Sequence, residues 1–338
     1  MKCCCAVILL VLAGIAGTAD AATVCVSTAN DIQSALNNAA ANGEDDVIDI
    51  VAGSYPLSTK LTFNSSEAKS LTLSGGWSVG CVANSGAATT LDGQHAVQLL
   101  DAFNSNGNIS VSQITFVAGT ADVGSDAIVT VSTSIGQIWV DLNTFIGNRS
   151  ISGVGALRIY GGSGGAVRVR GNLVVANRGA LLGGVYVSAG GGESYITGNT
   201  IVSNTTDAAG VAGGLTVNGG HFWITNNIIW NNAGATGSDF STLSPHSRFA
   251  NDIGLVGTGY LGYPIEGEQS VDPQFSSCGG FLCFELAWYS PLVDAGVDVV
   301  AEGQLLGVDR ARKPRILGAH VDIGAFENEV IFVDGFEP

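Results

Sequence analysis

Charged residues are scarce in this sequence, and basic residues are the scarcest. Lys and Arg number 13 against 29 Asp and Glu, which gives a formal net charge of −16, and only 12% of the 338 residues are charged. So negative a balance argues against non-specific binding to nucleic acid, because a phosphate backbone attracts basic surfaces. The charge suits a soluble protein in a salty exterior, and it does not identify a substrate.

Long apolar runs are also missing. The run Ala6–Ala16 follows the basic Lys2 and precedes the small residues Ala19-Asp20-Ala21. It is too short to span a membrane. A basic start, an apolar core and a small-residue cleavage site are instead typical of an export signal. We expect residues 1–22 to be a signal peptide and the remaining chain to have no membrane span; an uncleaved anchor is the alternative.

Cysteine is rare outside this signal. Three of the seven cysteines lie within it, and the others are Cys25, Cys81, Cys278 and Cys283. An even number of cysteines in an exported chain indicates disulfides, here with three possible pairings. We favour Cys25–Cys81 and Cys278–Cys283, which join the cysteines nearest in sequence. A zinc site is the alternative, although no His lies at ligand spacing beside these cysteines.

Recognisable catalytic motifs are absent as well. The sequence has no Ser/His/Asp order, no Gly-rich phosphate loop and no pair of His at metal spacing. His221 and the three other histidines are isolated, and a lone His is usually structural or merely exposed. The sequence therefore predicts no cofactor and no metal site.

What the chain does contain is a repeat. The segment Asn143-Thr-Phe-Ile-Gly-Asn148 recurs in varied form from Asn172, Asn199 and Asn226, at steps of 29, 27 and 27 residues. A period of this size is typical of a solenoid, a propeller or an array. Gly accounts for 48 residues, and small and β-branched residues alternate, which favours short strands and tight turns.

We interpret the repeat as a right-handed parallel β-helix. Each turn has three strands, as at 215–218, 222–225 and 227–230, and successive turns pair in parallel at about 4.8 Å. Roughly eight turns of ~29 residues fit between residues 46 and 275. Equivalent Asn side chains can then stack, each amide donating to the next carbonyl. We expect this structural ladder at Asn143, Asn172, Asn199 and Asn226.

The two ends differ from the repeat. Residues 27–41 predict a helix that Asn30 or Asp31 caps, with Ile32 and Leu36 on one face, and such a helix would cover the open end of a solenoid. After Asn232 the repeat fades. The expected organisation is therefore a signal peptide (1–22), a parallel β-helix with an N-terminal cap (23–275) and an irregular C-terminal capping or anchor-type module (276–338).

Four pieces of the C-terminal region resemble a known module. They are, in order, Asp272-Pro-Gln-Phe275, Ser290-Pro-Leu-Val-Asp-Ala-Gly296, Asp309-Arg-Ala-Arg-Lys-Pro314 and Asp322-Ile-Gly-Ala-Phe-Glu327. They are similar to the C-terminal module of bacterial exported β-helix proteins of the "choice-of-anchor Q" or pectin-lyase-like type. The sequence departs from that pattern at 311–313. The resemblance implies a secreted or surface-associated bacterial protein and no particular reaction.

Many β-helices of the pectin-lyase-like class act on polysaccharides laid along their first sheet. The outward positions expected there include Arg158, Tyr160 and Tyr186. A cation between aromatic rings would suit an anionic sugar. Basic residues also cluster between 149 and 178, and we expect one positive patch that adds Arg149, Arg168, Arg170 and Arg178 to these residues. Ion pairs with Asp122, Asp126 or Asp141 are the alternative use of these arginines.

The sequence thus predicts an exported, non-catalytic, monomeric β-helix that binds carbohydrate or a cell-surface glycan, or that serves in adhesion. The alternative is a polysaccharide lyase or glycoside hydrolase acting on an acidic polysaccharide. A hydrolase needs carboxylates that converge at a set separation. Asp122, Asp126 and Asp141 lie near one another in the repeat, but none forms the paired-Asp motif of β-helix hydrolases. No catalytic residue is therefore named.

Overall fold

The computed structural model describes residues 21–207, 212–234, 238–242, 244–257, 264–277, 283–298 and 304–328. All but the last two residues of the expected signal peptide lie outside these ranges, and so does Cys278. Within the described ranges, no helix has the length and apolar character needed to cross a membrane.

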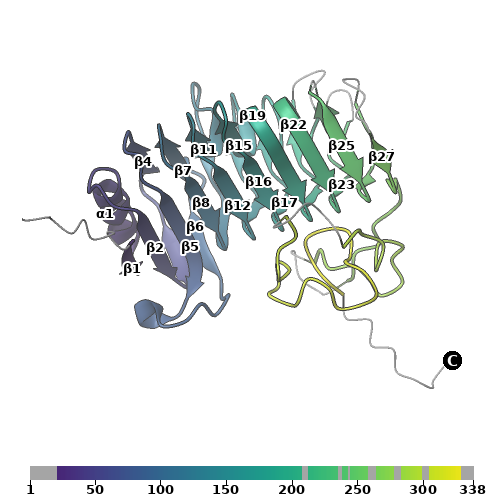
Figure 1. The fold of residues 1–338 in the computed structure, drawn as a ribbon, viewed down its shortest axis with the longest axis horizontal. Helices are drawn as coiled ribbons and strands as arrows, with labels where there is room; N and C mark the ends of the chain where they lie inside the picture. Colours follow the sequence, from purple (N-terminus) through teal and green to yellow (C-terminus); the bar gives the residue numbers. More distant parts are fainter. Residues whose placement is uncertain are drawn as a thin grey trace, which may run out of the picture.

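The chain winds into a coil in which the strands of successive turns pair in parallel, as expected (Figure 1). Each turn passes the same faces in the same order, and we call the strands that share a face a row. Rows 1 and 2 belong to one 15-stranded sheet, because two long strands run through both. Row 3 is an eight-stranded sheet and row 4 a four-stranded one. The fold is thus the predicted parallel β-helix.

Rows 1 and 2 share β19 (Val185–Thr197) and β22 (Leu215–Thr225). The other strands of row 1 are β4 (Leu61–Ser65), β7 (Leu100–Asn104), β11 (Ala127–Thr133), β15 (Val154–Gly161) and β24 (Phe240–Thr242). The other strands of row 2 are β1 (Ala22–Val26), β2 (Asp46–Val51), β5 (Leu71–Trp77), β8 (Ile109–Ser112), β12 (Ile138–Asp141), β16 (Val167–Arg170), β25 (His246–Phe249) and β27 (Ile265–Glu266).

Rows 3 and 4 have shorter strands. Row 3 contains β3 (Gly53–Pro56), β6 (Thr89–Asp92), β9 (Ile114–Val117), β13 (Thr144–Ile146), β17 (Leu173–Val175), β20 (Thr200–Val202), β23 (Ile228–Trp230) and β26 (Asp252–Ile253). Row 4 contains β10 (Thr120–Ala121), β14 (Arg149–Ser150), β18 (Arg178–Gly179) and β21 (Thr205–Thr206).

The core is built from equivalent positions of successive turns. In row 1, Leu100, Val129, Leu157 and Val185 are neighbours in register and fully buried. Their neighbours along each strand point outward, because successive side chains of a strand face opposite sides. The interior of the coil is therefore a continuous apolar column, and candidate ligand-binding side chains are confined to the outer faces of the rows.

The N-terminal end is covered by α1 (Ala29–Ala39), which buries Ile32 and Leu36 on the first coils. Its N-cap is Thr28, whose hydroxyl accepts a hydrogen bond from the amide of Asp31, so the expected cap at Asn30 or Asp31 is wrong. A Ser or Thr side chain at this position satisfies one of the free amides of the first helical turn.

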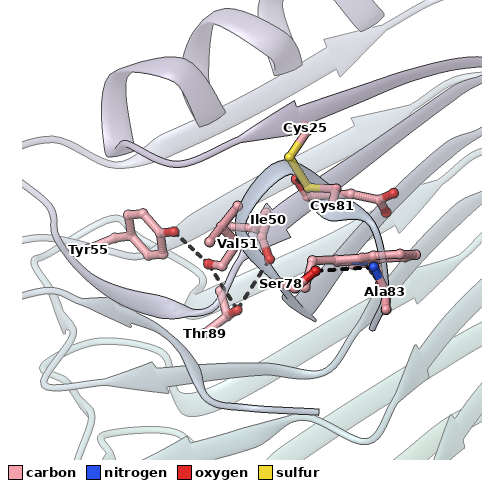
Figure 2. The surroundings of a disulfide bond; sticks show 11 residues. Cys25, Ile50, Val51, Tyr55, Ser78, Cys81, Ala83 and Thr89 are labelled. Carbon is pink, nitrogen blue, oxygen red and sulfur yellow. Dashed lines mark hydrogen bonds between the residues drawn. A yellow bond between two sulfur atoms is a disulfide. The ribbon is translucent and has the colours of Figure 1, made fainter. Parts of the chain in front are cut away.

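A disulfide fastens this end of the coil. Figure 2 shows Cys25 of β1 bonded to Cys81, which ends the short 3₁₀ helix η1 (Val79–Cys81). This confirms the Cys25–Cys81 pairing. The bond joins residues 56 positions apart, and closing a loop of that length restricts the unfolded chain. Cys283 is also disulfide-bonded, whereas its expected partner Cys278 lies outside the described residues.

Between rows 2 and 3 the Asn side chains form a continuous ladder. The amide nitrogen of Asn143 donates to Asn172 Oδ1 at 3.2 Å, and that of Asn172 donates to Asn199 Oδ1 at 2.9 Å. The next member is Asn227, at 2.9 Å from Asn199, followed by Asn251. All are fully buried.

Asn226 is therefore not a ladder residue, and the prediction for this position is wrong. It adopts a left-handed backbone conformation, with φ of 57°. Gly171 and Gly198, which precede the ladder residues of the two previous turns, also have left-handed conformations. Asn tolerates this conformation better than other non-glycine residues. Its side chain instead bonds the backbone of Val297, with both distances 2.9 Å.

A second ladder lies between rows 3 and 4. Asn148, Asn177, Asn204 and Asn232 follow one another at 2.8, 2.9 and 2.9 Å between amide nitrogen and carbonyl oxygen. The side-chain amide of Asn232 in turn donates to Asp239 Oδ1 at 2.9 Å, which ends the ladder. Two buried ladders thus fix the register on either side of row 3, since a slip of one residue would leave their amides without partners.

The described part of the C-terminal region lies along the side of the coil, against row 3 (Figure 1). The row 3 strands β13, β17 and β20 are buried on both faces, because their outward residues pack against this region. Those outward residues include Leu173, Val175 and Val202, and they contact a cluster that contains Leu286, Leu292 and Ile323. This position differs from a cap stacked only on the last turn.

Polar residues of the motif pieces hold this region in place. Arg315 bonds the carboxyl of Glu327 and the carbonyls of Asp322 and Gly324. Asp309 accepts from the amides of Lys313 and Glu327, at 2.7 and 2.8 Å. The side chains of Arg310 and Thr144 join the region to row 3 at 2.8 Å. The motif residues therefore have structural partners.

One buried carboxyl beside this region is expected to make stability depend on pH. Asp252 of β26 is fully buried and accepts from the amide of Val271 at 2.9 Å. Burial, reinforced by nearby carboxyls such as that of Asp239, raises its pKa to about 7. The folded protein then keeps a proton that the unfolded chain releases near the ordinary pKa of about 4. Its contribution to stability is therefore present at low pH and is lost as pH rises towards 7.

We expect the free energy of unfolding to fall by roughly 2–3 kcal/mol between about pH 5 and about pH 8 through this group alone. Asp252→Asn keeps the shape of the side chain and removes the titration, so the variant should show a smaller fall. Urea unfolding of both proteins at the two pH values measures the difference. Equal falls in the two proteins would show that Asp252 is ionised in the folded state.

Candidate functional site

The seven expected ligand-binding residues lie on three different rows. Row 1 presents Arg158, Tyr160 and Tyr186, row 2 presents Arg168 and Arg170, and row 4 presents Arg149 and Arg178. The expected single positive patch is therefore not formed. The reason is the coil itself, since residues about ten apart in sequence lie on adjacent faces of one turn.

The row 1 residues come together. Arg158 and Tyr186 are neighbours in register on β15 and β19, and Tyr160 lies two residues after Arg158 on the same face. The guanidinium carbon of Arg158 is 4.6 Å from the ring centroid of Tyr160 and 5.2 Å from that of Tyr186. The two rings meet edge to face at 6.2 Å. A cation beside ring faces is favoured by about 0.5–2 kcal/mol.

Polar groups surround this cluster. Arg158 Nη1 pairs with Asp126 at 3.2 Å, and the Asp126 side chain is 60% exposed. Within the described structure, the Nε atom of Arg158 has no hydrogen-bond partner, and the same is true of the hydroxyls of Thr130 and Thr216 in the same register column. Buried donors without partners are uncommon, because each costs free energy.

The two arginines of row 2 have different partners. Arg170 binds both carboxyl oxygens of Asp141, at 2.9 and 2.6 Å, and both side chains are largely buried. Arg168 lies between two rings instead, with its guanidinium carbon 5.4 Å from the Trp139 centroid and 5.8 Å from the Tyr195 centroid. Arg170 therefore serves an ion pair within the protein, which was the alternative use expected for these arginines.

Row 4 holds the remaining two arginines at a corner of the coil. Arg149 and Arg178 are neighbours in register and both are exposed. Arg178 pairs with Asp207 at 2.9 Å, and both side chains are more than half exposed. Exposed pairs of this kind contribute about 0–1 kcal/mol. This corner resembles an ordinary solvated surface.

Sequence reasoning missed an aromatic line on row 2. Trp139, Arg168, Tyr195 and Trp223 are neighbours in register on four successive turns. Their spacings of 29, 27 and 28 residues match those of the corrected Asn ladder. Aligning the turns on Asn227 instead of Asn226 would have placed Trp223 in this line.

Next to Trp223 lies a group that resembles a nucleophile relay. His221 Nε2 is 3.3 Å from the hydroxyl of Ser247, and His221 Nδ1 is 3.3 Å from the carboxyl of Glu193. A nucleophile, a base and an orienting acid have this order. Ser247, however, is only 2% exposed, so its hydroxyl cannot meet a substrate in this conformation. The group is better explained as side-chain packing around Trp223.

Asp126 and Asp141, two of the acidic residues considered for hydrolysis, do not converge. Asp126 faces row 1 beside Arg158, whereas Asp141 is bound to Arg170 on row 2. In the part of the chain that the structure describes, no group of three or more His, Cys, Asp or Glu is placed to hold a metal ion.

Comparisons with known proteins give little further information. No protein-family model matches the chain, and no curated protein matches it. Among solved structures, the crystal structure of pectate lyase Pel9A is similar with a TM-score of 0.38 and 13% sequence identity, covering 83% of this chain and 88% of that chain. A likeness this distant carries no argument about the activity of this chain.

Proposed function

We propose that this protein is an exported, non-catalytic β-helix that binds carbohydrate on the outer face of row 1. The observation that carries the proposal is the placement of Arg158 beside the rings of both Tyr160 and Tyr186. Flat rings stack on the apolar faces of sugars, and a guanidinium binds carboxylate or sulfate through paired hydrogen bonds. The ligand that fits both features is an acidic glycan.

Several features support an extracellular setting. Residues 1–22 have the pattern of an export signal, and the disulfide Cys25–Cys81 is of a kind that persists in oxidising compartments. The motif pieces between 272 and 327 resemble a module of bacterial surface proteins. We infer a bacterial protein of the cell surface or exterior, in which the glycan ligand serves attachment.

One observation favours a second function on the same face. The exposed carboxyl of Asp126 lies 3.2 Å from Arg158, so an acid and a cation stand together beside the proposed ligand. A polysaccharide lyase or glycoside hydrolase would use such groups for proton transfer. Cleavage of the bound glycan, seen as new reducing ends or as absorbance of unsaturated uronates, would contradict the non-catalytic proposal and support the enzymatic one.

Binding by row 1 is tested by Arg158→Gln, which removes the charge at the centre of the cluster. We expect the affinity for an acidic oligosaccharide to fall about tenfold or more, because a charge-assisted hydrogen-bond pair is lost. This affinity is measured by isothermal titration with short oligomers of galacturonate, alginate and hyaluronan. Arg178→Gln makes the same change of charge at an exposed corner and should alter affinity little. Equal effects of the two substitutions would refute the site.

A further inference from the structure

The outer face of row 2 carries an unbroken line of flat side chains. Trp139, Arg168, Tyr195 and Trp223 occupy one register column across β12, β16, β19 and β22. Each is partly exposed. These strands lie side by side in Figure 1, and the C-terminal region lies beyond one end of them, against row 3. The line is therefore open to solvent and separate from the row 1 cluster.

We propose that this line is a second glycan-binding surface, on which an extended acidic oligosaccharide lies parallel to the coil axis. Successive turns are about 4.8 Å apart, so the line offers one flat group per turn. That repeat is close to the length of one pyranose in an extended chain. Trp139 and Tyr195 lie two turns apart, so the two rings can contact two sugars that are two positions apart in one chain.

The charge of Arg168 indicates an anionic ligand. Its Nη1 donates to the side-chain oxygen of Gln137 at 2.7 Å, and its guanidinium is flanked by the rings of Trp139 and Tyr195. Among the described residues, no carboxylate lies within ion-pair distance of it, whereas Arg170 is bound by Asp141. A ring-flanked guanidinium without a bound carboxylate is complementary to a ligand carboxylate or sulfate.

The far end of the line is held in a fixed orientation. The indole nitrogen of Trp223 donates to Glu193, and its ring stacks on Phe249 with centroids 5.8 Å apart. His221 meets the same indole edge to face at 5.2 Å. A side chain held in this way loses little conformational entropy on binding. Glu193 and His221 also offer polar atoms to sugar hydroxyls at this end.

The competing explanation is that the line only stabilises contacts between turns. A structural role would change stability and leave any glycan affinity untouched, so the test measures both. The test is done in the Arg158→Gln background, which removes the positive charge of the row 1 cluster. The probes are short oligomers of galacturonate, alginate and hyaluronan, each with its carboxyl-methylated form as a neutral counterpart, and affinity is measured by isothermal titration.

We expect Arg168→Gln and, separately, Trp139→Ala to weaken binding of an acidic oligomer about tenfold or more, while thermal unfolding shows that each variant is folded. Arg168→Lys keeps the charge and loses the planar fork, so its loss should be smaller. The matched controls are Arg149→Gln, at an exposed corner of row 4, and Trp288→Ala, at an indole that is 72% exposed elsewhere. Both should change affinity less than about twofold.

The row 2 proposal is overturned if no acidic oligomer binds the Arg158→Gln protein, if the methylated forms bind equally well, or if the controls weaken binding as much as Arg168→Gln. These outcomes separate the two surfaces. Binding lost entirely with Arg158→Gln leaves row 1 as the site. Binding that survives Arg158→Gln and then fails with Arg168→Gln supports row 2. Row 1 is tested separately, by the fall in affinity that Arg158→Gln alone produces.

Discussion

Replacing Asn199 by alanine is expected to lower the free energy of unfolding by about 3–5 kcal/mol, because several buried polar groups lose their partners at once. The side-chain oxygen of Asn199 accepts from the backbone and side-chain amides of Asn172, both at 2.9 Å. Its amide nitrogen donates to Val169 O at 2.8 Å and to Asn227 Oδ1 at 2.9 Å. Since Asn199 is fully buried, water cannot replace these bonds in the intact coil.

The measurement is urea unfolding followed by circular dichroism, and the matched control is Asn218→Ala. Asn218 is a half-buried residue of row 1 with one side-chain bond, to Tyr186 at 3.3 Å. Its loss should cost less than about 1 kcal/mol. Asn199→Asp should also destabilise, because an ionised carboxylate can accept from Asn172 but cannot donate to Val169. Equal stability of Asn199→Ala and Asn218→Ala would mean that the ladder contributes nothing beyond ordinary surface bonds.

Replacing Arg315 by alanine is expected to destabilise the protein by about 3–5 kcal/mol, because it leaves buried acids without their counter-charge. The side chains of Arg315 and Glu327 are 5% and 1% exposed. Burial raises the pKa of Asp309, Asp322 and Glu327, and the positive charge of Arg315 opposes that shift in all three by favouring the ionised carboxylates. Without the guanidinium these carboxyls must be protonated or exposed, and the C-terminal region should separate from row 3.

Hydrogen exchange resolves this effect from global unfolding. Amides of β13, β17 and β20 should exchange faster in Arg315→Ala, since their outer face becomes exposed. The control is Arg312→Ala in the same region. Arg312 is exposed and makes one described side-chain bond, to Gln113 at 3.1 Å, so its loss should cost under about 1 kcal/mol. If Arg315→Ala leaves both the stability and the exchange of row 3 unchanged, the buried pair does not hold the region in place.

Much of the fold could be predicted from local patterns. The recurrence of Asn143, Asn172 and Asn199 gave the period, and the alternation of residues in each strand gave the inward side. The error at Asn226 has a physical cause. Asn is suited both to the ladder and to the left-handed position before it, so Asn226-Asn227 offers two registers. Only the hydrogen bond from Asn199 to Asn227 decides between them.

The candidate sites were less predictable, because they depend on which face each residue reaches. Arg158 with Tyr186 could be found, since the two align directly when the turns are superposed. The wider arginine cluster failed because Arg158 and Arg168 lie ten residues apart on different rows. The two arginines of β16 look alike in sequence, yet one binds Asp141 and the other lies between rings.

The coil follows from the sequence, since a period near 28 residues with recurring Asn and alternating strands leaves few other folds in which the backbone amides and carbonyls are all hydrogen-bonded. Which outer face is covered and which stays accessible depends on the packing of the folded chain. The C-terminal region covers the row 3 strands β13, β17 and β20, row 1 gathers Arg158 with two tyrosines, and row 2 keeps an open line of three aromatic rings and Arg168. Outward-facing side chains are not constrained by packing in the core. Which of them stay accessible therefore depends on how distant segments of the chain pack against each face.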